Sequence, residues 1–130
     1  MKDEIRKQYH FRPSPKGYYA WDVRKLISLA EPLPVILVEL EKIKELNENY
    51  WYNESAPSVR SVAEHAKLIS ESDLQFPIIL SSDGRVMDGM HRVAKAWMQN
   101  EKSIRAKQFT SDPLPDFVDV QPDDLDYSED

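Results

Sequence analysis

The sequence of 130 residues contains no cysteine and only three histidines. Without cysteine the chain forms no disulfide, has no thiolate nucleophile and lacks the usual zinc sites. His10, His65 and His91 are too few for a histidine-rich metal centre. The residues themselves therefore predict no transition-metal site.

The sequence also lacks long hydrophobic runs. No apolar segment approaches the roughly 20 residues that cross a bilayer, and the charged start Met1–Arg6 is not followed by the apolar stretch of a secretory signal. We therefore expect a cytoplasmic protein without a membrane partner. With 41% hydrophobic residues, 130 residues provide enough material for one core, so we expect one structural domain.

Basic residues are missing from the C-terminal end. Residues 110–130 contain eight acids and no Lys or Arg, which leaves 15 of the 23 acids and all 17 bases in residues 1–109, a net charge of +2 there. An acidic tail repels duplex DNA, which disfavours duplex DNA as a partner. The tail is either a solvated end or, because it contains Leu114, Phe117 and Val118, a segment that packs partly on the domain in extended form.

Local patterns predict the order strand, turn, strand, helix, strand between Phe76 and Phe109. Two short apolar runs flank the turn sequence Ser82–Gly84, which is typical of a hairpin. Apolar residues then recur at helical spacing from Met90 to Met98, and alternation in residues 104–109 indicates a half-buried strand.

Upstream, Val35–Leu40 reads as a strand, and Asp22 can cap a helix that ends before Pro34. A second helix begins near Ser58. Its apolar stripe predicts a buried face, with Arg60, Ser61, Glu64, His65 and Lys67 off that face; the stripe consists of Val59, Val62, Ala63, Ala66 and Ile69.

Two aromatic segments have open interpretations. Tyr9–Trp21 combines aromatic and basic residues, which could contact a nucleotide or form a packed N-terminal arm. The loop 45–57 carries Tyr50, Trp51 and Tyr52, which either wall a pocket or cover a sheet edge. Ser61 and His65 lie one helical turn apart and could approach one ligand, although such pairs are mostly surface pairs.

The junction Asp88–Arg92 carries the most chemistry. Gly89 lets the backbone approach a ligand, and the helix that follows offers free N–H groups and a partial positive charge. Arg92 can add a two-pronged donor, His91 a titratable ring and Asp88 a carboxylate for a hydroxyl or a metal. The alternative is an ordinary loop with an N-cap and solvated first-turn side chains.

The stretches Pro77–Leu80 and Asp83–Ala96 resemble the core of the ParB/sulfiredoxin superfamily, which has a Gly-x-[His/Arg]-Arg type signature at this junction. The resemblance covers residues 33–109 and is shared by small stand-alone bacterial proteins described as ParB-like. It implies an α/β fold of the α+β type, in which helices pack on a mixed sheet. Residues 1–32 would add an N-terminal aromatic arm and helix, and residues 110–130 an extended acidic tail.

The resemblance implies several activities, which are compared residue by residue. Sulfiredoxin chemistry is excluded because Met90 stands where those enzymes have their cysteine. Partition proteins bind CTP but need a downstream DNA-binding domain, and only 21 residues follow Phe109. Free serine kinases resemble Asp88–Arg92 and have a glutamate on the first strand, where Glu39 stands, but Met90 replaces the first histidine of their motif.

We therefore expect a phosphorylated small molecule, in particular a nucleotide such as ATP, ADP or CTP, at the helix that begins near Gly89 and Met90, held by His91 and Arg92. In an enzymatic version Glu39, Asp88 and His91 are catalytic and Mg²⁺ neutralises phosphate charge. The alternative is a non-catalytic nucleotide-sensing or protein-interaction module, with a homodimer left open; a nuclease is disfavoured. Three side chains are expected to line the substrate pocket: Trp51, Arg60 and His65.

Overall fold

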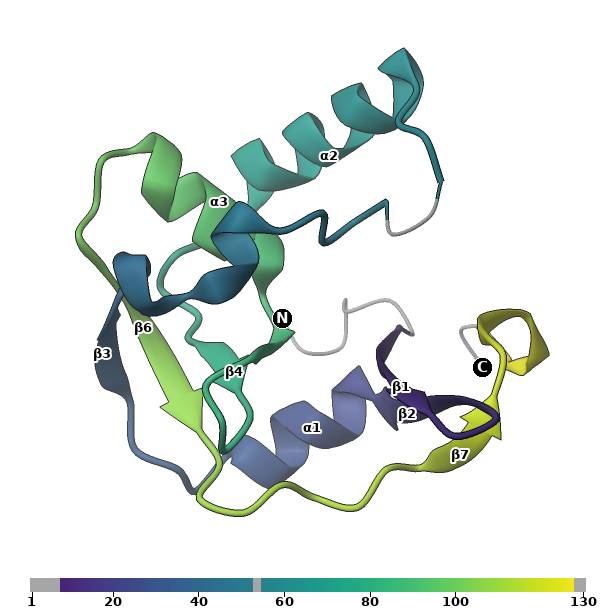
Figure 1. The fold of residues 1–130 in the computed structure, drawn as a ribbon. Coiled ribbons are helices and arrows are strands. Elements are labelled where there is room, and N and C mark those ends of the chain that lie inside the picture. The colour runs from purple at the N-terminus through teal and green to yellow at the C-terminus, as the bar shows by residue number, and fades with distance from the viewer. Residues whose placement is uncertain (1–7, 53–54, 128–130) are drawn as a thin grey trace.

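The computed structural model describes residues 8–52 and 55–127, which form an α+β fold with two sheets (Figure 1). The strands are β1 (Tyr9–Ser14), β2 (Gly17–Asp22), β3 (Ile36–Glu39), β4 (Ile78–Leu80), β5 (Val86–Asp88), β6 (Ser103–Gln108) and β7 (Phe117–Val120). The helices are α1 (Val23–Ala30), α2 (Val59–Glu71) and α3 (Met90–Met98), and short 3₁₀ turns occupy Leu40–Lys42, Lys44–Asn47 and Pro122–Asp124.

The larger sheet has the strand order β3-β6-β4-β5. Strand β6 pairs with β4 in parallel, while the β3–β6 and β4–β5 pairs are antiparallel, so the sheet is mixed as expected. In the turn of the β4–β5 hairpin, Gly84 adopts a φ of +86°, a conformation that suits glycine. The predicted hairpin, the strand at 104–109 and the strand near Val35–Leu40 are confirmed within one or two residues.

Strand β4 is buried on both faces, which explains its continuous apolar sequence. Because side chains alternate along a strand, Ile78 and Leu80 join the core under α3, whereas Ile79 joins a second core with Leu26 of α1. Figure 1 shows α3 and α1 on opposite sides of β4. This arrangement fixes the end of β5, and with it the start of α3.

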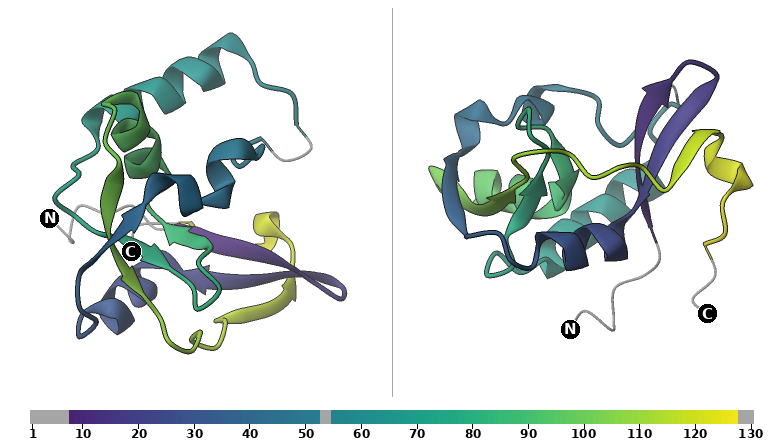
Figure 2. Two further views of the ribbon diagram at one scale, coloured as in Figure 1. Left: turned by 60° about the vertical axis from the view of Figure 1, so that its left-hand side comes forward. Right: turned by 90° about the horizontal axis from the view of Figure 1, so that it is seen from below.

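The aromatic N-terminal segment is a β-hairpin, β1–β2, and the acidic tail adds β7 as a third strand beside β2. Extended packing of the tail is therefore confirmed. The predicted cap of α1 is also confirmed, because Asp22 accepts a hydrogen bond from the backbone N–H of Arg24. In Figure 2 the purple hairpin and the yellow tail strand lie together beside the larger sheet.

The prediction for the buried face of α2 is wrong. No residue of α2 is buried, and Val59 and Val62 are 90% and 52% exposed. The side that contacts the molecule is partly buried at Ser61, His65 and Ile69 instead. Polar contacts hold it on this side: His65 Nδ1 lies 2.9 Å from His91 Nε2, and Lys95 Nζ donates to the carbonyl oxygens of Ser70 and Ser72 at 3.1 and 2.6 Å.

The apolar spacing of α3 is only partly used for burial. Met90, Val93 and Ala96 are buried, but Trp97 and Met98 at its end are 63% and 65% exposed. The helix ends as expected, since Asn100 takes the left-handed conformation with a φ of +62°.

Candidate functional site

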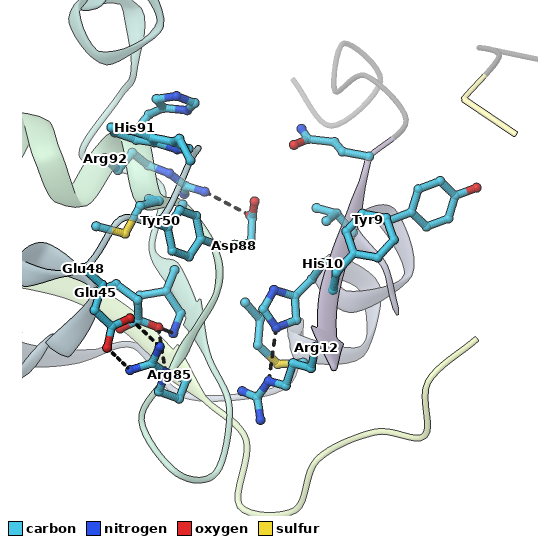
Figure 3. A pocket seen from close by; sticks show the side chains of 18 of the residues that line it. Tyr9, His10, Arg12, Glu45, Glu48, Tyr50, Arg85, Asp88, His91 and Arg92 are labelled. Carbon is cyan, nitrogen blue, oxygen red and sulfur yellow. Dashed lines mark hydrogen bonds and ion pairs between the residues drawn. The ribbon is translucent and has the colours of Figure 1, made fainter. Parts of the chain in front are cut away.

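A cleft of about 930 Å³ separates strand β1 from the start of α3 and the loop before α2. Figure 3 shows His10 and Arg12 on one wall, and Glu45, Glu48 and Arg85 on the other. The Asp88–Arg92 junction also lines the cleft. The structure therefore places the predicted junction at a cavity large enough for a small molecule.

The first turn of α3 is open. Its N-cap is Gly89, which has no side chain to cap the helix, and the N–H groups of Met90, His91 and Arg92 have no acceptor among the described residues. Gly89 has a φ of +107°, and a Cβ there would lie 2.7 Å from Ile78 Cγ2. The glycine thus permits close packing of the junction on β4 and leaves the helix end free to bind an anion.

The guanidinium group of Arg92 forms hydrogen bonds within the protein. Its Nη2 donates to Asp88 Oδ2 at 3.0 Å, and its Nη1 donates to the carbonyl oxygens of Phe76 and Pro77, each at 2.9 Å. A guanidinium with these partners holds the junction in place rather than reaching freely into the cleft. Its charge still lies beside the first turn of α3, where it favours an anion.

The opposite wall contains a buried carboxylate. Glu45 is 2% exposed, and its Oε2 accepts from the backbone N–H of Val86 at 2.6 Å and lies 3.3 Å from Arg85 Nε. Its Oε1 is buried without a hydrogen-bond partner among the described residues. Because an unsatisfied buried carboxylate oxygen is costly, a hydrogen-bond donor that reached this atom would be favourable.

Arg85 is shared between two glutamates. Its Nη1 and Nη2 donate to the carboxylate of Glu48 at 2.9 and 2.6 Å, and this pair lowers the pKa of Glu48 and raises that of Arg85. Nearby, burial and the charges of Glu45 and Asp88 raise the pKa of Tyr50 to about 12. Tyr50 therefore remains a neutral hydroxyl donor at physiological pH.

His10 is neutral at pH 7. Burial, followed by the charges of Arg12 and Arg85, lowers the pKa of His10 to about 4. Its Nε2 accepts from Arg12 Nε at 3.3 Å, which places the proton of the neutral ring on Nδ1. Arg12 also donates to Ser81 Oγ at 2.8 Å and lies 3.5 Å from Asp83.

His91 belongs to a stacked cluster. Its Nε2 lies 2.9 Å from Nδ1 of His65, and Trp51 stacks on both rings, with centroids 4.4 Å from His65 and 4.8 Å from His91. Burial and the neighbouring His65 and Arg92 lower the pKa of His91 to about 4. At pH 7 His91 is thus no imidazolium acid, and it can offer a phosphate only a neutral hydrogen bond.

The charged side chains of the cleft nearly balance one another. Four carboxylates face three guanidinium groups, so attraction of an anion depends on the helix end and on local arrangement rather than on an excess of positive charge. These groups are Glu45, Glu48, Asp83 and Asp88, and Arg12, Arg85 and Arg92.

Two predicted site residues lie outside the cleft. Glu39 lines a separate depression with Trp97 and pairs with Lys42 at 3.5 Å, and Arg60 is exposed on α2. Trp51 and His65 join the cleft through the stack with His91. The structure therefore does not bring Glu39 or Arg60 to the Asp88–Arg92 junction.

Sequence reasoning missed the wall formed by Glu45, Glu48 and Arg85, and did not pair His10 with Arg12. The missed signal for Glu45 is its position in the apolar context of Leu40, Ile43 and Leu46. An acid among core residues is unusual, but only the fold shows that it faces a cleft.

Within residues 8–52 and 55–127, no group of three or more His, Asp or Glu side chains is placed to hold a metal ion. In the same part of the chain, every helix is too short or too polar to cross a membrane.

Comparison of the chain with protein-family models, curated proteins and solved structures gave no match. The resemblance of residues 33–109 to the ParB/sulfiredoxin superfamily therefore stays a prediction. The α+β architecture itself is what the structure shows.

Proposed function

We propose that the cleft binds a phosphorylated small molecule that also carries a hydroxyl or amino group, as a nucleotide does. The observation that carries the proposal is the uncapped first turn of α3, whose free N–H groups open onto a cleft of about 930 Å³. Free amides and a helix dipole favour a phosphate at this position. Arg92, which is held beside them by Asp88, adds positive charge.

The second contact is Glu45. Its free Oε1 requires a donor, which a ribose hydroxyl, an amino group or an acceptor substrate can provide. A ligand that places phosphate at α3 and a donor at Glu45 satisfies both walls of the cleft. This combination distinguishes the proposed ligand from a simple inorganic anion.

The same oxygen supports phosphoryl transfer as a second candidate function. In that reaction an acceptor hydroxyl oxygen would form a bond to the terminal phosphorus of a nucleotide, and the bond from that phosphorus to the leaving diphosphate oxygen would break. Glu45 would take the hydroxyl proton, and Mg²⁺ bound to the nucleotide phosphates would neutralise their charge. In this version Glu45 replaces Glu39 as the base.

Calorimetric titration with ATP, ADP, CTP and inorganic phosphate, each with Mg²⁺, tests the proposal. We expect saturable nucleotide binding that phosphate weakens by competition. Glu45→Gln should reduce nucleotide affinity about tenfold while leaving phosphate binding largely intact, since one charge-assisted hydrogen bond is lost. Any phosphoryl transfer should also be lost in this variant.

Glu39→Gln is the matched control, because Glu39 is exposed and lies outside the cleft. This variant should bind as the unchanged protein does. Absence of binding by every phosphate compound to the folded protein would refute the proposal, and equal effects of the two substitutions would remove Glu45 from the site.

A further inference from the structure

Helix α2 presents its apolar face to solvent. Val59 and Val62 are 90% and 52% exposed, and Ala63 and Ala66 are also exposed. Figure 1 and the left view of Figure 2 show α2 at an outer edge of the molecule, with both sheets on one side of it. An amphipathic helix with an uncovered apolar face typically marks an interaction surface.

The opposite side of the helix is already used. Ser61 and His65 face the molecule, where His65 contacts His91 and Ser61 completes the capping box with Ser58. The exposed apolar stripe is therefore not a face that has failed to reach the core. The helix meets the molecule through one side and leaves the stripe for another partner.

A row of alternating charges borders the stripe. Arg60, Glu64, Lys67 and Glu71 are spaced by four, three and four residues, which places them along one flank of the helix. None of the four forms an ion pair with another described residue. From the start of the helix to its end the charges are positive, negative, positive and negative. An antiparallel copy of the helix therefore presents the opposite sign at each of these positions.

We infer that α2 pairs with α2 of a second copy of this chain in an antiparallel, two-fold symmetric dimer. A two-fold axis between His65 and Ala66 sets Arg60 opposite Glu71 of the second copy, and Glu64 opposite its Lys67. Symmetry repeats each pair, so the flank provides four ion pairs. A parallel pairing in register would set like charges opposite each other.

The apolar stripe fits the same register. The small side chains of Ala63 and Ala66 lie near the axis, where they let the helices approach closely, and the exposed Val62 and Val59 follow towards the start of the helix. Larger residues thus flank a close central contact, an arrangement suited to packing of two helices. Charge and shape therefore indicate the same partner and the same direction.

Cysteine cross-linking tests the direction directly, because the sequence has no cysteine of its own. Ala66→Cys places two thiols beside the two-fold axis and should give a disulfide-linked dimer under mild oxidation. In Val59→Cys the thiols would lie about 20 Å apart along the helix axis, at about 1.5 Å per residue, too far for a disulfide. Equal cross-linking of both variants would show a parallel pair and overturn the inference.

Charge exchange tests the register. Glu64→Lys and Lys67→Glu should each weaken the homodimer roughly tenfold or more, because the symmetric attractive pairs become repulsive. A mixture of the two variants should form a heterodimer preferentially, since each charge then meets its opposite. A merely structural role of these residues in one chain would give no such recovery on mixing.

Analytical ultracentrifugation of the unmodified chain should show a reversible dimer, and Val62→Asp should make it monomeric. The matched control is Leu37→Asp, because Leu37 is an apolar residue on the edge strand β3 and is 70% exposed, more than Val62. A chain that remains monomeric at all concentrations would overturn the inference. So would a dimer that survives Val62→Asp and is lost in Leu37→Asp, because the edge strand would then be the interface.

Discussion

Two independent features of the structure require glycine at position 89. Its φ of +107° lies where side chains with a Cβ are strained, and the space that a Cβ would fill is occupied by Ile78. Gly84 also has a positive φ, of +86°, but no atom lies within 4 Å of the position that a Cβ would take. Comparing substitutions at the two glycines therefore distinguishes the cost of backbone strain from the cost of a steric clash.

We expect Gly84→Ala to destabilise the protein by about 1 kcal/mol, the order of the left-handed strain alone. Gly89→Ala should cost about 1–3 kcal/mol more, because the added methyl displaces Ile78 or Arg92. Urea denaturation of both variants measures the difference. Equal losses would contradict the close contact at Gly89.

At the same scale, Glu39 and Glu45 show what residue patterns cannot decide. Glu39 ends strand β3 and Glu45 follows it six residues later, and the resemblance favoured Glu39 on the strand itself. In the structure Glu39 points to a separate depression, while the turns Leu40–Lys42 and Lys44–Asn47 carry Glu45 back under β5. The path of these short turns depends on tertiary packing, so the sequence could not choose between them.

At the scale of elements, the tail strand β7 is held by a small number of polar contacts. Asp116, just before β7, accepts from the backbone N–H of Asp22 at 2.8 Å and from Lys25 Nζ at 2.9 Å. The next residue, Phe117, pairs with Ala20 in the β2–β7 ladder. Asp116 therefore connects the tail to the junction of β2 and α1.

We expect Asp116→Ala to destabilise the protein by about 1–2 kcal/mol, because the carboxylate that accepts both hydrogen bonds is removed. Hydrogen exchange at β2 should increase together with this loss, since β7 would detach from its edge. Asp123→Ala, an exposed acid in the same tail, serves as the control and should have little effect. Unchanged exchange at β2 in Asp116→Ala would show that β7 is held by other contacts.

Helix α2 is the element whose buried face the apolar periodicity predicted wrongly. Its stripe of Val59, Val62 and Ala66 has the spacing of a core face, yet that face is exposed. Periodicity shows that a face is suited to burial, but not whether this chain or another covers it. The position of α2 was predictable in sequence, and its orientation was not.

For the whole molecule, the two histidines with lowered pKa values predict how stability depends on pH. His10 and His91 have pKa values of about 4 in the folded state, against about 6.5 when exposed. The unfolded chain therefore binds more protons between these values. Stability should be complete above about pH 6.5 and fall as the pH drops towards 4.

We expect the free energy of unfolding to fall in this window by up to about 1.4 kcal/mol per pH unit for His10, and by less for His91, because solvent screens its partly exposed ring. Urea denaturation between pH 7 and 5 measures the slope before most carboxylates titrate. His10→Gln and His91→Gln should each flatten it. A stability independent of pH over this range would show that neither ring is held neutral by the fold.

The sequence by itself determined β3, the elements between Phe76 and Phe109 and the positions of α1 and α2, because the hairpin at 78–88, the glycine at the helix start and the cap at Asp22 act through neighbouring residues. Only the tertiary structure decided which residues share the cleft. His10, Glu45 and Asp88 come from distant segments, and their distances, burial and charges arise when β1 lies across from β5 and α3. Local backbone preferences are encoded over a few residues, whereas a site and an exposed helix face depend on how whole segments pack against one another.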